Sequence, residues 1–341
     1  MAHLKGTKCS CLILFMLALS FDPAAAIDLP ATKYCIPPAP RGAISFWPPR
    51  QAQIFQALGP VQALPHALQK AFHLSDDFRP MTFPQPGDWL AVHPEEGQPF
   101  EDFIRCEWNR PDRTRNKIYL QPLGEFLPGP SPPLDRLQEW AAAYFTLEVK
   151  VQPVLRIDHQ AITSRLNPLT NHRQLLVDDL LALLGEKLPA DAFCLLGITN
   201  EDLYPNPEWN FVFGMATLRA RVGIISLARY DPSLYGEPRS PDFQRRLLKR
   251  TGKVMIHEIG HMCGLLHCIY CKCIMNGSNH LPEGDLRPPH LCPVCLRKLH
   301  HALGFDVGAR YRQLLKVYQK CGFESEAGWV EKRLERITGD N

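Results

Sequence analysis

Residues 257–267 read His-Glu-Ile-Gly-His-Met-Cys-Gly-Leu-Leu-His, and this stretch guides the interpretation of the whole chain. His257 and His261 are four residues apart, so on an α-helix their side chains project from one face, one turn apart. Their ring nitrogens can then share one Zn²⁺ ion. Glu258 can reach a water on that ion and take its proton. The segment therefore predicts a helix that carries a catalytic zinc.

A third histidine completes the predicted metal site. We expect a helix over residues 245–265, and Gly264 can end it because glycine accepts the left-handed conformation that other residues resist. The chain then turns back and brings His267 to the same ion. Three neutral imidazoles leave the fourth position open, which is typical of a catalytic zinc site.

Six of the 12 cysteines lie within this segment or shortly after it. They are Cys263, Cys268, Cys271, Cys273, Cys292 and Cys295. A CxxC pair with two further cysteines about twenty residues upstream is the spacing of a closed, structural zinc site. The upstream pair stays open, because Cys268 with Cys271 gives the common CxxC spacing and Cys268 with Cys273 gives a wider one. Disulfides are the alternative explanation of the cluster.

Strands and helices are predicted to alternate from residue 117 onward. We expect strands at 117–121, 146–155, 192–198 and 222–227, and helices at 134–145 and 174–184. This alternation indicates an α/β layered domain. We assign it to residues 116–341, with the zinc helix in an upper part, 116–264, and the cysteines and carboxyl-terminal helices in a lower part, 265–341.

The amino terminus has the layout of a secretory signal peptide. Lys5 and Lys8 precede an apolar run over residues 9–21, and three alanines follow. That run is shorter than the ~20 residues of a spanning helix, so no stable membrane insertion is expected. Residues 1–26 therefore predict a secreted or extracellular protein.

Residues 27–115 form a proline-rich arm ahead of the predicted domain. Residues 53–72 could hold a helix, but Pro60 and Pro65 would interrupt it. The arm is expected to pack on the rest of the chain because its aromatic side chains need burial. These are Phe46, Trp47, Phe55, Phe72, Phe78, Phe83 and Trp89.

Composition excludes two classes of partner. The chain has 341 residues, with 38 Lys+Arg against 35 Asp+Glu and a formal net charge of +3. A near-neutral chain gives no electrostatic case for a nucleic-acid or membrane-surface partner. The apolar share of 45% and the charged share of 21% are ordinary for a soluble globular protein.

The combined motifs resemble those of the archaemetzincins, zinc metalloproteases of the metzincin group. The resemblance runs from His257 to Cys268, then through Cys273-x-Met275 and the CxxC pair at 292–295. It is closer to the vertebrate type 2 members, because His267 is kept. It implies an α+β zincin domain of the metzincin kind, with a twisted mixed sheet, an active-site helix and a zinc-stabilised carboxyl-terminal subdomain.

The resemblance also assigns roles that spacing leaves open. It pairs Cys268 with Cys273, so Cys271 becomes a bystander. The implied ligands of the structural zinc are Cys268, Cys273, Cys292 and Cys295. Met275 becomes the Met-turn residue, which packs beneath the three histidines and binds no metal. The cofactors implied are two Zn²⁺ per chain, one catalytic and one structural.

The expected function is peptide-bond hydrolysis by a zinc metallopeptidase with Glu258 as general base, and the resemblance suggests action at amino ends. Residues 222–227, the last strand before the zinc helix, are our candidate for the edge strand that pairs with an extended substrate, and an ordinary core strand is the alternative. The alternative is a non-catalytic zinc module of the same fold that recognises peptides. Because the family looks intracellular, a cytoplasmic location is the alternative to secretion.

Overall fold

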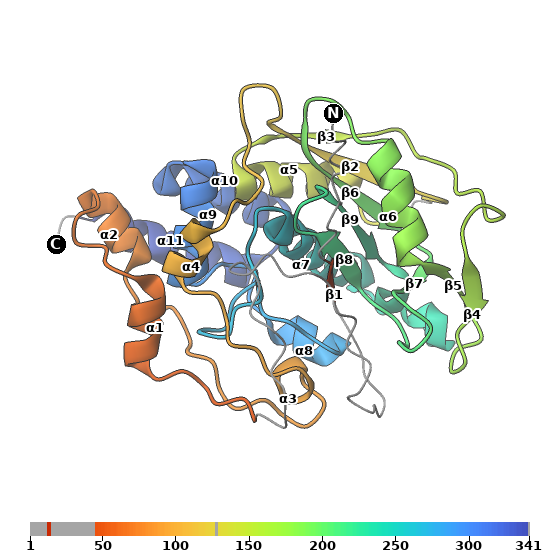
Figure 1. Cartoon of the computed structure of the whole chain (residues 1–341), viewed down its shortest axis with the longest axis horizontal. Helices are drawn as coiled ribbons and strands as arrows, with labels where there is room; N and C mark the ends of the chain where they lie inside the picture. Colours follow the sequence, from red (N-terminus) through yellow and green to blue (C-terminus); the bar gives the residue numbers. More distant parts are fainter. Residues whose placement is uncertain (1–11, 15–44, 127–128, 340–341) are drawn as a thin grey trace, which may run out of the picture.

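The computed structural model describes residues 12–14, 45–126 and 129–339. Its centre is a six-stranded sheet in the order β1-β8-β9-β6-β2-β3 (Figure 1). The strands of this sheet are β1 Leu12–Leu14, β2 Lys117–Leu123, β3 Glu148–Val151, β6 Ala192–Thr199, β8 Gly214–Thr217 and β9 Val222–Ser226. Strands β9, β6, β2 and β3 are parallel, and β8 runs antiparallel between β9 and β1. The mixed α/β fold expected from the sequence is confirmed.

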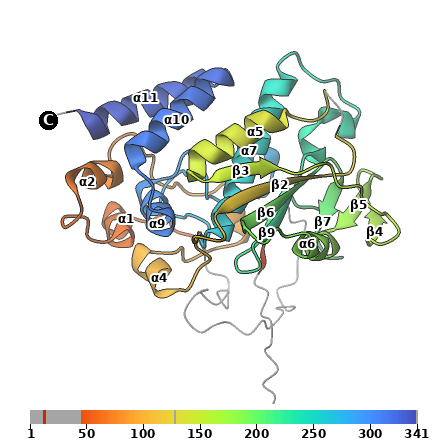
Figure 2. The same cartoon turned by 90° about the horizontal axis from the view of Figure 1, so that it is seen from above.

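Helices cover both faces of this sheet. Helices α5 (Leu134–Phe145) and α7 (Phe243–Met262) lie on one face, and α6 (Val177–Glu186) lies on the other (Figure 2). Every residue of β6 and β9 is buried, as expected for parallel strands that are covered on both sides. A smaller sheet of β4 (Ser164–Leu166), β5 (Arg173–Leu176) and β7 (Asp202–Tyr204) lies beside α6.

The first and last parts of the described chain pack against each other. The amino-terminal helices are α1 Gln51–Leu58, α2 His66–Phe72, α3 Trp89–Val92 and α4 Phe100–Arg105. The carboxyl-terminal helices are α8 Leu281–Leu286, α9 Pro293–Leu303, α10 Val307–Lys320 and α11 Glu324–Thr338. Two 3₁₀ turns, Ala228–Tyr230 and Pro232–Tyr235, connect β9 to α7. Helices α1, α2 and α4 contact α9, while α10 packs on α5 and α11.

Several predicted elements form where the sequence placed them. Helix α5 spans the predicted 134–145, and the arm has α1 and α2 on either side of Pro60 and Pro65. The helix expected to begin at residue 174 begins at Val177, since residues 173–176 form β5 and pair with β4 and β7. Pairing with β4 and β7 overrides the helical pattern there.

The burial expected for the aromatic residues of the arm is partly wrong. Trp47, Phe55 and Phe83 are 73%, 47% and 58% exposed, whereas the other four are buried. Trp47 and Phe83 contact each other edge to face, with 5.3 Å between ring centroids. Two aromatic side chains can therefore pack against each other at the surface instead of in the core. Composition does not reveal this.

The edge-strand expectation for residues 222–227 is also wrong. Strand β9 lies inside the sheet, hydrogen-bonded to β6 on one side and to β8 on the other. The strand Gly214–Thr217, which the sequence analysis did not identify, lies beyond it. Its outer side pairs with Leu12–Leu14. Strand β8 has only four residues, too few to produce a visible pattern.

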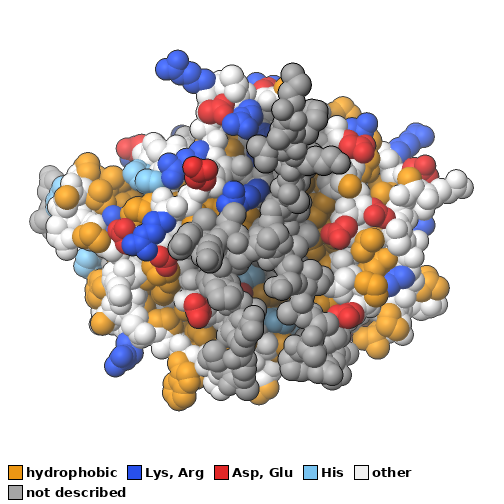
Figure 3. Space-filling view, in the orientation of Figure 1, with side chains coloured by type: hydrophobic (Ala, Val, Ile, Leu, Met, Phe, Trp, Pro, Cys, Tyr) orange, Lys and Arg blue, Asp and Glu red, His pale blue; other side chains and the backbone are white. Residues whose placement is uncertain are grey.

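The predicted signal segment 1–26 falls outside the described residues except for Leu12–Leu14. Within the described ranges, no helix combines the length and the apolar character needed to cross a membrane. Where Figure 3 shows described side chains, acidic and basic groups are interspersed across that face.

Candidate active site and metal centres

Helix α7 buries the first two histidines and the carboxylate between them. His257, Glu258 and His261 have no exposed surface, and α7 packs on β6, β8 and β9 and against α5 beside it. Gly252 permits the close approach to α5, since a Cβ there would lie 2.0 Å from the Trp140 ring. The helix is thus held firmly enough to present its histidines in one geometry.

A tight turn brings His267 back to α7. Helix α7 ends at Met262, and Gly264 has a φ of +86°, the left-handed conformation predicted for it. A hydrogen bond from Leu265 N to Gly260 O, 3.1 Å, closes the turn. The His267 ring then lies 5.3 and 5.1 Å, between centroids, from those of His257 and His261. One ligand nitrogen from each ring lies within 4.8 Å of the others.

Hydrogen bonds at the Nδ1 atoms determine the tautomers of the three rings. His257 Nδ1 lies 2.8 Å from Ile274 O, and His261 Nδ1 lies 2.6 Å from Leu265 O. His267 Nδ1 lies 2.8 Å from a carboxylate oxygen of Glu95. Carbonyl and carboxylate oxygens only accept, so each Nδ1 carries the proton and each Nε2 presents a lone pair.

The converging Nε2 atoms match a metal site. The Nε2 atoms of His257 and His261 are 2.8 Å apart, and two bare lone pairs at that distance repel unless a cation lies against them. Burial lowers the pKa of both rings well below the usual value, which keeps them neutral and able to bind a metal. The three imidazoles therefore fit a zinc ion, and their Nδ1 partners fix the orientation that it requires.

Glu258 is a buried carboxylate with an unusual environment. Neither of its oxygens has a hydrogen-bond partner among the described residues. Burial raises its pKa well above the usual value, and the guanidinium of Arg287 opposes that rise. Gly214 at the start of β8 leaves room for it, since a Cβ there would lie 2.8 Å from Glu258 Oε1. A buried polar group without a partner is costly, so it indicates a functional position.

The four cysteines named by the resemblance form a second cluster. Sulfur atoms of Cys268, Cys273, Cys292 and Cys295 all lie within 4.8 Å of one another, and all four side chains are buried. The Cys268 and Cys292 sulfurs are 3.5 Å apart, well beyond the ~2.05 Å of a disulfide. Burial raises the pKa of the Cys273 thiol well above the usual value, so a cation beside it would favour its thiolate form.

The loop before α8 explains why Cys271 lies outside this group of four. Asn276 donates to the carbonyl oxygens of Cys268 and Cys271, at 2.7 and 2.9 Å, and accepts from Cys273 N at 2.8 Å. This folds the segment so that the wider of the two spacings closes the cluster. Met275 is buried against α7, where a Cβ at Gly260 would lie 2.6 Å from its sulfur.

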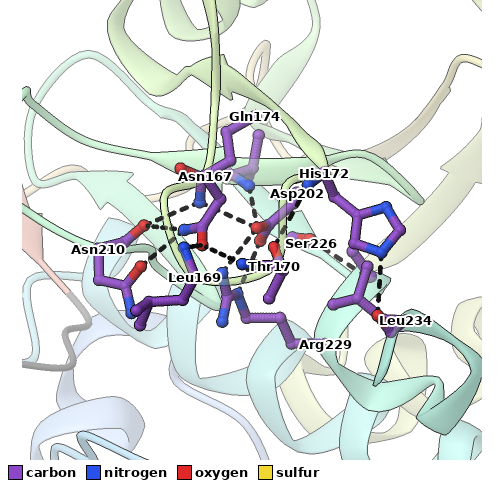
Figure 4. A network of polar contacts seen from close by, with 12 residues as sticks. Asn167, Leu169, Thr170, His172, Gln174, Asp202, Asn210, Ser226, Arg229 and Leu234 are labelled. Carbon is purple, nitrogen blue, oxygen red and sulfur yellow. Dashed lines mark hydrogen bonds and ion pairs between the residues drawn. The ribbon is translucent and has the colours of Figure 1, made fainter. Parts of the chain in front are cut away.

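A buried polar network anchors the segment that leads into β8. Arg229 donates to both carboxylate oxygens of Asp202, at 2.9 and 2.8 Å, and both side chains are buried (Figure 4). Gln174 donates to Asp202 and to the carbonyl oxygen of Asn210, whose side chain accepts from Asn167 at 2.6 Å. This network positions residues 205–213 and hence the start of β8 beside Glu258.

A third group of potential ligands has another use. Asp88, His280 and Glu283 place one polar atom each within 4.8 Å of the others. The His280 ring bridges Asp88, at 3.0 Å, and the backbone N of Glu283, at 3.2 Å. Glu283 in turn accepts from the backbone N atoms of Trp89 and Asn279. These bonds join α3 to α8, so we assign no metal to this group.

Sequence reasoning missed several residues around the three histidines. Glu95 comes from the proline-rich arm, Gly214 from the short strand β8, and Arg287 from the end of α8. Arg287 Nη1 lies 2.7 Å from Asn276 O and 3.1 Å from His257 Nδ1. None of them has a local motif that would have drawn attention to it.

The chain is similar to several known proteins. The model of peptidase family M54 matches residues 154–301. Archaemetzincin-2 of Rattus norvegicus is 38% identical over 275 residues, which cover 72% of this chain and 76% of the relative. A solved archaemetzincin from Methanopyrus kandleri is 31% identical over 57% of this chain and 99% of its own, with a TM-score of 0.45. A solved zinc-dependent peptidase from Methanocorpusculum labreanum is 27% identical over 53% and 99%, with a TM-score of 0.44.

The match to the rat relative extends well beyond the zinc motif, over more than two thirds of both chains. Archaemetzincin-2 of Homo sapiens is likewise 37% identical over 71% of this chain and 75% of its own. The chain therefore belongs to the archaemetzincins, peptidase family M54, and is a zinc metalloprotease.

Proposed function

We propose that this chain hydrolyses peptide bonds at the three-histidine cluster, with Glu258 as the general base. One observation carries the proposal: three Nε2 lone pairs converge beside a buried carboxylate that has no hydrogen-bond partner in the described chain. In a structural site, all polar groups would be paired with one another. A carboxylate whose oxygens accept no hydrogen bond is instead suited to proton transfer.

His257, His261 and His267 would hold the catalytic zinc through Nε2. Bound there, Zn²⁺ supplies a Lewis acid that polarises the scissile carbonyl and lowers the pKa of water towards ~7. The neutral tautomers of the rings favour this binding, because no proton has to leave Nε2 first.

Glu258 would accept the proton of the attacking water and return it to the departing amine. Its position next to His257 on α7 places it one residue from a ligand, and the lack of a Cβ at Gly214 leaves room for its Oε1 atom. Arg287 lowers its pKa against the effect of burial and so favours the ionised form that a base requires.

We propose that extended peptides pair with β8. This strand contacts α7 and begins beside Glu258, and its outer side takes an antiparallel segment, Leu12–Leu14. Removal of residues 1–26 would leave this side as a strand edge, which supplies main-chain hydrogen bonds that suit any peptide sequence. The family resemblance favours substrates that are cut at their amino ends.

The four-cysteine cluster would bind a second, structural zinc, which makes two per chain. Four thiolates close the coordination shell and leave no position for a reacting group. We also propose that residues 1–26 are a signal peptide. Amino-terminal sequencing of the cellular protein tests this, since a start near residue 27 supports secretion and an intact start supports the cytoplasmic alternative.

The decisive experiment is a cleavage profile on a peptide library with wild type, Glu258→Gln and the exposed control Glu186→Gln. We expect Glu258→Gln to retain its zinc and lose about 10²–10⁴-fold in kcat, because the amide cannot accept the proton. The control should cleave as wild type does. Unchanged cleavage by Glu258→Gln would overturn the mechanism.

The same library addresses the non-catalytic alternative. Peptide binding by the zinc-loaded wild type, without any product, would support a recognition module. Products that all lack one amino-terminal residue would establish aminopeptidase action, and internal cuts would contradict it.

A further inference from the structure

We propose that Glu95 is a positioning residue for the catalytic metal site, and that residues 95–98 of the proline-rich arm hold His267 and its loop in place. This inference rests on the proposed function of the three-histidine cluster. It gives the arm a part in the active centre, although the arm lies outside the residues matched by the family model.

The central contact is a hydrogen bond between side chains 172 residues apart. His267 Nδ1 lies 2.8 Å from Glu95 Oε1, and the His267 side chain is only 3% exposed. Trp89 Nε1 donates to the same oxygen at 2.8 Å, and the Trp89 ring meets His267 edge to face. Because a carboxylate only accepts, Glu95 keeps the proton on Nδ1 and leaves Nε2 for the metal.

His267 needs this support more than the other two ligands do. His257 and His261 belong to a packed helix, and their Nδ1 atoms donate to backbone carbonyls. His267 lies in the turn beyond the helix, where the ring has no helical scaffold. His267 donates to a carboxylate instead, and such a partner also makes the imidazole a stronger ligand.

The same arm segment holds the backbone of that turn. The buried side chain of Gln98 donates to Gly264 O at 3.0 Å and accepts from Leu266 N at 3.1 Å. Lys298 on α9 donates to both oxygens of Gln98, at 3.0 and 2.9 Å. Gln98 is thus hydrogen-bonded to Lys298 on one side and to the turn on the other. It fixes the path of the backbone that leads into His267.

The backbone of residues 95–98 closely approaches the segment that follows His267. Gly97 has a φ of +78°, and a Cβ there would lie 2.6 Å from Ile269 and 2.9 Å from the Tyr270 hydroxyl. The arm can therefore lie directly on the segment that follows His267. Contacts on both sides of His267 indicate that the arm sets the geometry of the third ligand.

The test uses the full chain with Glu95→Ala, Glu95→Gln and the control Glu96→Ala. Glu96 is an exposed neighbour, so the control changes charge and backbone in the same way without reaching His267. We expect Glu95→Ala to weaken binding at the three-histidine site by about 10–100-fold in competition with a chelator. The Co²⁺-substituted protein should show an altered visible spectrum, and kcat should fall more than KM rises.

Glu95→Gln keeps an acceptor oxygen but loses the charge, so it should recover most of that affinity and still bind less tightly than wild type. The four-cysteine site should keep its metal in all variants and serves as an internal reference. Wild-type affinity and an unchanged Co²⁺ spectrum in both Glu95 variants would overturn the proposal, whatever their activity.

Two further outcomes separate this inference from the proposed function. If Glu95→Ala fails to fold, Glu95→Gln decides the question by the same metal competition, since the two side chains have the same shape. If Glu258→Gln remains active while the Glu95 variants lose metal affinity, the mechanism fails and the positioning role stands. The reverse pattern overturns only the positioning role.

Discussion

The three-histidine and four-cysteine clusters are neighbours, with His267 and Cys268 adjacent in the chain, but they are supported in different ways. All four sulfurs come from residues 268–295, and Asn276, within the same segment, organises them. The histidines take their Nδ1 partners from three separate places: the turn after α7, the loop before α8 and the proline-rich arm.

This difference follows from what each site would have to do in the function proposed above. A closed thiolate site needs only ligands that one loop and the start of a helix can supply, so its support is local. An open site must keep three rings in place while one position stays available for reaction. That requires partners from elements that the fold brings together from far apart. The three predictions below separate local from distant support, starting with the largest effect.

Removal of one thiolate should have the largest effect. We expect Cys273→Ser to reduce the metal content from two zincs to one and to cost several kcal/mol of stability, because zinc binding and folding are coupled. Cys271→Ser, a matched change two residues away, should keep both zincs. Metal analysis and thermal unfolding measure the two effects. Loss of zinc in Cys271→Ser but not in Cys273→Ser would reverse the assignment.

The turn before His267 should be the next most sensitive point. Gly264→Ala introduces a Cβ at a positive φ, 2.3 Å from Cγ of Trp108 in the arm. Backbone strain and overpacking each cost about 1–3 kcal/mol. We expect denaturant unfolding to show this loss, and chelator competition to show weaker metal binding at the histidines only.

Gly304→Ala is the control for backbone strain alone, since Gly304 has a φ of +69° but no heavy atom within 4 Å of its ideal Cβ. It should lose less stability than Gly264→Ala and retain the metal affinity of the histidines. Equal losses in the two variants would show that contact with Trp108 contributes nothing.

The packing residue under the histidines should be the least sensitive. Met275→Leu conserves volume, so we expect a loss below ~1.5 kcal/mol and a full complement of two zincs. Differential scanning calorimetry and metal analysis would measure both. A missing zinc in this variant would identify Met275 as a ligand and contradict the packing role predicted from the sequence.

Predictions from sequence succeeded where contacts are local. The stripe on residues 134–145 identifies α5, and the prolines at 60 and 65 mark the gap between α1 and α2. Predictions from sequence failed where pairing between strands determines the structure. Residues 222–227 form a strand as expected, but β8 on their outer side makes that strand internal. The helix predicted from residue 174 begins later for the same reason.

The sequence by itself identified the candidate ligands of the site. Helical periodicity places His257 and His261 on one face, and the left-handed conformation of Gly264 turns the chain towards His267. Only the tertiary structure brought Glu95 to that third histidine, gathered the four sulfurs whose pairing spacing alone left open, and placed the start of β8 against Glu258. Ligand spacing is a local property of one chain segment, whereas these contacts exist only after distant segments pack together.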